Sequence, residues 1–298
     1  MNTLQNLKYR RKVLAPRTSL LVAMALGPSR AVAVVLLAAV CCLQGAQGRS
    51  PPYPPIPPRP PVCPADAPLI KLNFEQNERK RVQVVEYDTY IPNLSSFTIH
   101  YWFNLRDTAT TNTMFNYATD PYTGTELLEV QLESKEGGRH QFWKITIKGV
   151  ETRVSSFPPI RKGEWYHALH SWESSTGIIS HYINGELLQS HYNYQTKGLV
   201  IPAGGIAQSG QTRSARFLYN SVDQGEGLNG WLTLFQLSAK PIGVPTSSDS
   251  VAAKAERAFN CADDHDKEGE TISWNRTPRK GFGGVTETPS YNSVCGQF

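Results

Sequence analysis

The chain has 298 residues, which is long for one domain but within the range of large all-β domains. Its formal net charge of +5 comes from residues 1–48, which carry six Lys or Arg and no acid. Without those six, 24 basic residues stand against 25 acidic ones. A near-neutral body with no basic stripe excludes the electrostatic footprint of a nucleic-acid-binding protein.

Residues 31–43 (AVAVVLLAAVCCL) form an apolar run of thirteen. A membrane-spanning helix needs about 20 apolar residues. Basic residues before the run and small residues after it are typical of a signal peptide. We predict residues 1–48 to be a signal peptide cleaved after Gly48, hence secretion and no membrane span, with Met24 as an alternative start. The competing interpretation is a type II membrane anchor over residues 20–43, which Pro28-Ser29-Arg30 would interrupt.

Residues 49–65 are rich in proline, with nine prolines between Arg49 and Pro64. Proline fixes φ and removes the amide donor, so this segment favours polyproline II and cannot enter a sheet interior. We expect a stiff stalk. The alternative, a ligand for an SH3 or WW domain, conflicts with secretion because those partners are intracellular.

Cys63, Cys261 and Cys295 remain after the signal peptide, an odd number for an oxidising compartment. One of them is therefore free or links two chains. Because N-glycosylation applies to secreted chains, we also predict glycosylation sites at the two sequon asparagines, Asn93 and Asn275.

Beyond the stalk, short apolar runs alternate with turns. The predicted strands are 69–74, 82–87, 97–103, 114–117, 127–132, 142–147, 165–172, 178–183, 199–201, 217–219 and 231–237. Alternation within residues 142–147 places 143, 145 and 147 on one face, as expected for a strand with one buried side. Asn184-Gly185 predicts a two-residue hairpin between residues 178–183 and 186–190.

One helix is predicted, at Val251–Phe259, because alanine favours helix and Ser or Asp residues precede the segment. The fold class is therefore all-β: a two-sheet antiparallel jelly-roll sandwich over residues 66–298, with one short helix near the C-terminus. The aromatic side chains mostly sit inside strand patterns, so we expect them to pack in the core. Tyr192 and Tyr194 look loop-borne and offer an alternative as sugar-stacking residues.

Several motifs resemble pentraxins and related laminin-G-like modules. Residues 97–103 (FTIHYWF) and 114–119 (MFNYAT) resemble the strands that open the pentraxin signature, and residues 167–177 (HALHSWESSTG) match its most distinctive stretch. The resemblance covers roughly residues 66–298. It implies a non-catalytic extracellular binding module, and because pentraxins form rings, it also implies a homo-oligomer.

The departures from the pentraxin pattern bear on function. The family's disulfide maps onto His100 and Leu169, so that bond cannot form here. A Cys261–Cys295 bond, which the resemblance to pentraxin-like modules implies, would close a 35-residue loop instead. The calcium loops of the family retain only Asp120, Asp223 and Glu226 as carboxylates, while Arg213 places a cation among them. Calcium takes six to eight oxygen ligands, so we expect a degraded site and no cofactor, calcium being the alternative.

Two other stretches rich in acidic residues allow alternative functional interpretations. The acidic stretch 262–270 lacks EF-hand spacing, so a solvated turn is expected, with a weak mineral or calcium contact as the alternative. Residues 126–133 raise the question of a jelly-roll glycoside hydrolase, since Glu129 and Glu133 share a strand face. The glucanase pattern Glu-x-Asp-x-x-Glu is absent, so we predict no enzyme activity.

Taken together, the sequence predicts a secreted binding or scaffold protein of extracellular matrix, including mineralised matrix, whose partner is an extracellular glycan or matrix protein. The competing class is a calcium-dependent lectin or pattern-recognition pentraxin.

Overall fold

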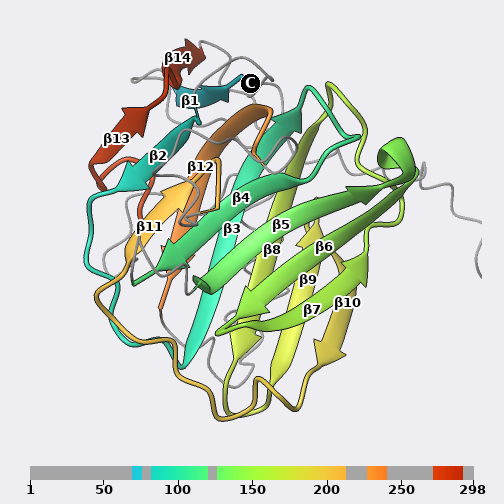
Figure 1. The fold of residues 1–298 in the computed structure, drawn as a ribbon, viewed down its shortest axis with the longest axis vertical. Helices are drawn as coiled ribbons and strands as arrows, with labels where there is room; N and C mark the ends of the chain where they lie inside the picture. Colours follow the sequence, from blue (N-terminus) through green and yellow to red (C-terminus); the bar gives the residue numbers. More distant parts are fainter. Residues whose placement is uncertain (1–68, 76–81, 120–125, 213–226, 240–270, 291–298) are drawn as a thin grey trace, which may run out of the picture. The chain divides into compact units, whose positions relative to one another are not determined.

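Two antiparallel sheets pack face to face in the computed structural model of the chain (Figure 1). The structure describes residues 69–75, 82–119, 126–212, 227–239 and 271–290. In spatial order, the first sheet contains β10 (Glu186–Tyr192), β9 (Ile178–Ile183), β8 (Trp165–Glu173), β3 (Ser96–Leu105), β12 (Gly230–Ser238), β1 (Leu69–Phe74) and β14 (Thr286–Ser290). The second contains β13 (Arg279–Phe282), β2 (Val84–Tyr87), β11 (Ile206–Ser209), β4 (Asn112–Ala118), β5 (Glu126–Lys135), β6 (His140–Ile147) and β7 (Val150–Ser155).

This architecture confirms the predicted two-sheet antiparallel sandwich. The predicted strand at 199–201 is wrong: Ile201 makes only an isolated bridge with Leu94, because Gly198 and Pro202 confine the extended stretch to a few residues. The predicted strand at 217–219 and the helix at Val251–Phe259 lie outside the described residues, as do the leader and the stalk. No helix in the described part of the chain is long and apolar enough to cross a membrane.

The sandwich interior follows the predicted alternation. Trp143, Ile145 and Ile147 of β6 are all fully buried, as their spacing indicates. Aromatic rings join the two layers: Phe115 of β4 stacks on Phe235 of β12 at 5.2 Å, and Phe103 of β3 meets Trp143 edge-on at 5.7 Å. Such pairs add about 0.5–1.5 kcal/mol each beyond the area they bury.

Two local features explain the register of the first sheet. His100 of β3 lies directly opposite Leu169 of β8, so these two positions face each other as the resemblance to pentraxins implied. Asn184 and Gly185 join β9 to β10 with φ of 51° and 81°, the left-handed values of a type I′ hairpin. The Asn184 side chain also accepts a hydrogen bond from the backbone N–H of His167 at 2.9 Å, which fixes the turn against β8.

One polar chain interrupts the apolar interior. The Tyr101 hydroxyl lies 3.0 Å from Nε2 of His170, and Nδ1 of His170 lies 3.1 Å from Nδ1 of His181. Both imidazoles are fully buried. Burial and the nearby imidazoles lower the pKa of His170 well below its usual value, and burial with His191 lowers the pKa of His181 to about 3. The pair is therefore neutral at physiological pH.

Candidate functional site

The sequence-predicted site residues fall into two groups. Asp120, Asp223, Glu226, Cys261 and Cys295 lie outside the described residues, together with Arg213, Cys63 and the acidic stretch 262–270. The two sequon asparagines, Asn93 and Asn275, are described and exposed, so glycosylation at both stays a prediction with accessible acceptors. The Asn93 Oδ1 accepts a hydrogen bond from the Ala203 N–H at 2.8 Å.

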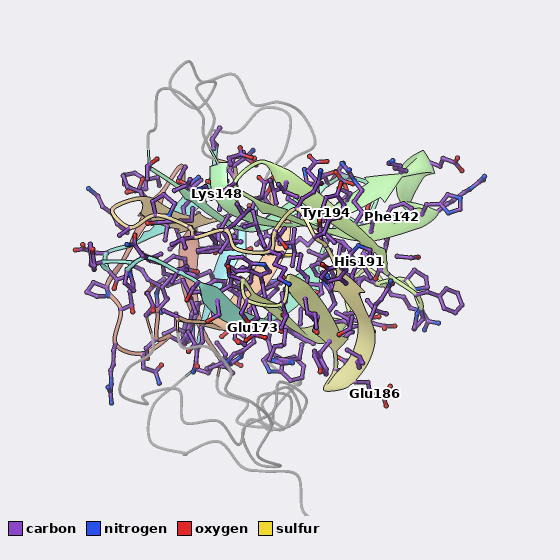
Figure 2. All side chains as sticks on the ribbon, turned by 90° about the horizontal axis from the view of Figure 1, so that it is seen from below. Phe142, Lys148, Glu173, Glu186, His191 and Tyr194 are labelled. Carbon is purple, nitrogen blue, oxygen red and sulfur yellow. The ribbon has the colours of Figure 1, made fainter. Side chains whose placement is uncertain are left out.

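The prediction that Tyr192 and Tyr194 lie in a loop is only partly correct. Tyr192 is the last residue of β10 and not a loop residue, whereas Tyr194 lies in the turn that follows. Both side chains are exposed, at 58% and 71%. Figure 2 shows Glu186, at the other end of β10, projecting away from the ribbon, and Glu186 is likewise exposed.

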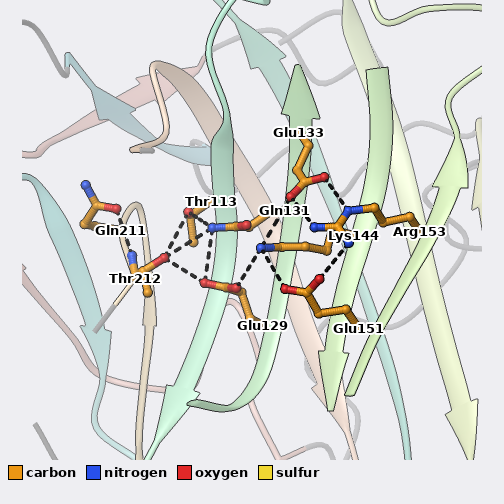
Figure 3. Close-up of polar contacts among 9 residues, drawn as sticks. All are labelled: Thr113, Glu129, Gln131, Glu133, Lys144, Glu151, Arg153, Gln211 and Thr212. Carbon is orange, nitrogen blue, oxygen red and sulfur yellow. Dashed lines mark hydrogen bonds and ion pairs between the residues drawn. The ribbon is translucent and has the colours of Figure 1, made fainter. Parts of the chain in front are cut away.

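A polar network lies on the outer face of the second sheet, on strands β4 to β7 and at Thr212 (Figure 3). On β5, Leu128, Val130 and Leu132 point into the core, so the alternate residues Glu129 and Gln131 point outward. Both are nonetheless buried, with 2% and 3% of their surface exposed. A buried carboxylate is costly unless it is paired and hydrogen-bonded, so its partners decide what this face can do.

Lys144 of β6 lies at the centre of the network. Its Nζ is 3.6 Å from Glu129, 3.5 Å from Glu133 and 3.9 Å from Glu151. The Lys144 side chain is only 13% exposed. One largely buried ammonium group therefore serves three carboxylates on neighbouring strands.

The other carboxylate oxygen of Glu129 receives neutral donors. The Thr212 hydroxyl donates to Glu129 Oε1 at 2.7 Å, and the Gln131 amide donates to the same oxygen at 3.2 Å. The Gln131 amide also reaches the Thr113 hydroxyl at 2.9 Å. Glu129 thus holds Thr212, the last described residue before residues 213–226, against β5.

Arg153 of β7 closes the network at the sheet edge. Its guanidinium donates to both oxygens of Glu133, at 2.8 and 3.1 Å, and to Glu151 at 2.6 Å. Burial by itself would raise the pKa of Glu133, but the hydrogen bonds from Arg153 and the charges of Lys144 and Arg153 outweigh it and lower that pKa. The hydrogen bond to Glu133 in turn raises the pKa of Arg153.

This donor set does not fit a calcium ion. Glu129, Glu133 and Glu151 each contact the ammonium of Lys144, which occupies the space between them that a cation would need. Within the described ranges, no group of three His, Cys, Asp or Glu side chains is arranged to hold a metal. Each carboxylate of the network contacts a cationic side chain of the protein itself.

The same geometry bears on the hydrolase alternative. Glu129 and Glu133 do share a face, as the strand period predicted. A glycoside hydrolase needs one carboxyl group with a raised pKa to act as the general acid. Glu133 has a lowered pKa and is held by Arg153, so it is ionised and cannot protonate a leaving group at neutral pH.

Sequence reasoning missed Lys144, Arg153 and Thr212 as members of this site. The alternation of residues 142–147 places Lys144 outward, which was the available signal. The strand that carries Arg153, β7, has no apolar run long enough to identify it. Thr212 gives no sequence signal, because its role depends on the pairing of β11 with β4.

Comparison with known proteins agrees with the fold. Residues 80–224 match the family model described as the concanavalin A-like lectin/glucanases superfamily. The chain is 27% identical to human pentraxin-related protein PTX3 over 195 residues, which cover 64% of this chain and 46% of PTX3. It is 27% identical to C-reactive protein 1.4 of Limulus polyphemus over 211 residues, covering 69% of this chain and 78% of that protein.

A solved structure gives the same result for the fold. A native heptameric SAP-like pentraxin from Limulus polyphemus superimposes with a TM-score of 0.60 at 18% identity, covering 76% of this chain and 97% of the pentraxin. The match to human PTX3 spans less than half of that protein's length. The chain thus contains a pentraxin/laminin-G-like module with the jelly-roll fold of the concanavalin A-like superfamily.

Proposed function

We propose that this protein is a secreted, non-catalytic binding or scaffold protein of the extracellular matrix whose pentraxin-like module works without a calcium ion. The observation that carries the proposal is the position of Lys144, whose ammonium contacts Glu129, Glu133 and Glu151 at 3.5–3.9 Å. Carboxylates that already contact a largely buried ammonium are not free to coordinate a divalent cation.

Secretion is proposed from the apolar run at residues 31–43 with its basic and small flanks, and from two exposed sequons. The proline-rich residues 49–65 supply a stalk that would hold the module away from its attachment point. A role in a mineralised matrix is the narrowest form of the proposal, motivated by the acidic stretch 262–270.

The test is thermal unfolding of the secreted chain, residues 49–298, in excess calcium and in chelator. A ligand at 100 times its dissociation constant adds about 2.7 kcal/mol, which raises the midpoint of a domain of this size by about 5–10 °C. We expect the two midpoints to coincide. Magnesium at the same ionic strength is the control for general salt effects.

A rise of several degrees that is specific to calcium would overturn the proposal. It would mean that Asp120, Asp223 and Glu226 still build a metal site, and it would identify the protein as a calcium-dependent lectin or pattern-recognition pentraxin. Incubating the same protein with polysaccharides and measuring reducing ends tests the second part. We expect no release of sugar, and release that a Glu129→Gln variant abolishes would contradict a non-catalytic role.

A further inference from the structure

A row of polar and aromatic side chains crosses five adjacent strands of the first sheet. Its members are paired neighbours in register from β14 to β8: Thr286, Asn73, Trp231, Asn104 and Trp165. We call these five residues the tryptophan row. Their sequence neighbours Leu72, Leu232 and Phe103 are buried in the core, so the row lies on the outer face of the sheet.

The tryptophan row is more exposed than the register beside it on the same strands. All five members are partly or fully exposed. The adjoining register, Thr233–Trp102–His167, is 0–3% exposed. The accessible tryptophans of the first sheet are therefore confined to one end of its outer face, at strands that Figure 1 shows side by side.

Lys71 of β1 places a cation between the two indoles. Its Nζ lies 5.2 Å from the ring centroid of Trp231 and 5.9 Å from that of Trp165. Within the described residues, the ammonium of Lys71 makes no hydrogen bond or ion pair, and burial lowers its pKa. A partly desolvated cation held over aromatic faces without a counter-ion favours the approach of an anion.

Arg106 adds a second cation in a fixed orientation. Its guanidinium carbon lies 4.7 Å from the Trp231 ring, and its two terminal nitrogens donate to the Phe74 carbonyl at 2.9 Å and to Asn73 Oδ1 at 2.6 Å. The one carboxylate bonded to the row is that of Glu75, which accepts from the Asn73 amide at 3.3 Å in the part of the chain described. Among these described residues, two cations thus stand against one carboxylate.

The combination points to one class of ligand. Indole rings stack on the apolar faces of pyranose rings, and lysine binds sulfate or carboxylate groups. The amides of Asn73 and Asn104 already donate within the protein, to Glu75 and to the Gly163 carbonyl, so Lys71 and the two indoles carry the recognition. We propose that the tryptophan row, with Lys71 and Arg106, binds an acidic polysaccharide, the anionic group lying at Lys71. The proposal names the partner class within the proposed binding function, at a face separate from the Lys144 network.

The experiment measures binding of immobilised secreted chain to a heparin octasaccharide, in chelator and at fixed salt. De-sulfated heparin separates sulfate from carboxylate recognition, dextran reports neutral saccharide binding, and polyglutamate stands for an acidic peptide. The variants are Lys71→Met and Trp231→Phe. Lys280→Met is the matched control, because Lys280 lies 5.0 Å from the ring of Phe282 on the other sheet.

We expect heparin binding to weaken about tenfold in Lys71→Met and about threefold in Trp231→Phe, with Lys280→Met unchanged and dextran and polyglutamate bound far more weakly. Equal losses in the two lysine variants would overturn the proposal in favour of diffuse charge attraction. Absence of heparin binding by the unmodified chain would overturn it as well, and so would tighter binding of polyglutamate.

The thermal midpoint of each variant shows that it is folded. A thermal midpoint that rises in calcium would contradict the proposed calcium-free function, but it would not change the difference in heparin binding between the Lys71 and Lys280 variants. The failure of the proposed function and the failure of this inference are therefore distinguishable.

Discussion

The outer faces of the two sheets differ in whether their lysine side chains are paired with carboxylates. On the second sheet, Lys144 is 13% exposed and is shared by three carboxylates, two of which Arg153 also binds. On the first sheet, Lys71 is partly exposed and lies over two indoles, without a counter-ion among the described residues. On one face each carboxylate of the network contacts a cationic side chain, and on the other face a cation is partly exposed to solvent.

This difference indicates which of the two faces is available to bind a ligand. A compensated network is a stabilising feature whose groups are already engaged, and its loss exposes a buried charge. An uncompensated cation beside aromatic rings contributes little to stability and remains available for a ligand. The two lysines are therefore expected to separate stability from recognition.

The largest effect is expected for Lys144→Met. Removing this ammonium takes away the ion pair that Lys144 makes with Glu129, a carboxylate that is 2% exposed. Loss of one partner of a buried pair costs about 3–5 kcal/mol. We expect the free energy of unfolding in urea to fall by about 3 kcal/mol.

Lys71→Met serves as the contrast in the same assay. Its stability should change by less than about 0.5 kcal/mol, as is usual for surface substitutions. Similar losses in both variants would break the comparison between the two faces.

A pH titration tests the buried pair of histidines, His170 and His181, between the two sheets. His170 and His181 have lowered pKa values in the folded chain, so below pH 6.5 the unfolded chain binds protons that the folded chain does not. Stability is therefore complete above pH 6.5 and falls as the pH decreases, by about 1.4 kcal/mol per histidine at pH 5.5.

Urea unfolding at pH 7.5 and 5.5 measures this loss. The carboxylate pKa of Glu133 is lowered, so that group stays ionised across this window and does not contribute. Replacing the exposed His140 with Asn controls for surface histidines. Equal stability at the two pH values would show that the His170–His181 pair accepts a proton inside the sandwich.

The smallest effect is expected for Arg153→Met. The Arg153 side chain is 43% exposed, and Lys144 still contacts both Glu133 and Glu151 after the change. We expect a loss of about 1 kcal/mol, reduced further in high salt. A loss as large as that of Lys144→Met, measured in the same urea assay, would show that the network depends on its edge and not on its centre.

Much of the fold could be predicted from local pattern. The period of two within residues 142–147 placed Trp143, Ile145 and Ile147 in the core, and Asn184-Gly185 identified the β9–β10 hairpin. Short strands with mixed polarity, such as β7 and β13, carry no comparable signal because their partners, not their own residues, stabilise them.

The sites were less accessible to sequence reasoning. The Lys144 network joins residues of β4, β5, β6 and β7 with Thr212, and the tryptophan row joins five strands from distant parts of the chain. Neither set is contiguous, so its members meet only through strand register. The aromatic rule, which assigned the tryptophans to the core, holds for Trp102, Trp143, Trp172 and Trp274 but not for Trp165 and Trp231, which lie on the accessible end of the sheet.

The pairing of His100 with Leu169 has a consequence for how the chain folds. Every cysteine of the sequence lies outside strands β1–β14, so the alignment of β3 with β8 is found by hydrogen bonding and burial alone. The two strands are far apart in sequence, and closing such a loop is entropically unfavourable and slow. The β3–β8 pair therefore forms without a disulfide between its own two strands, at a rate that chain topology limits.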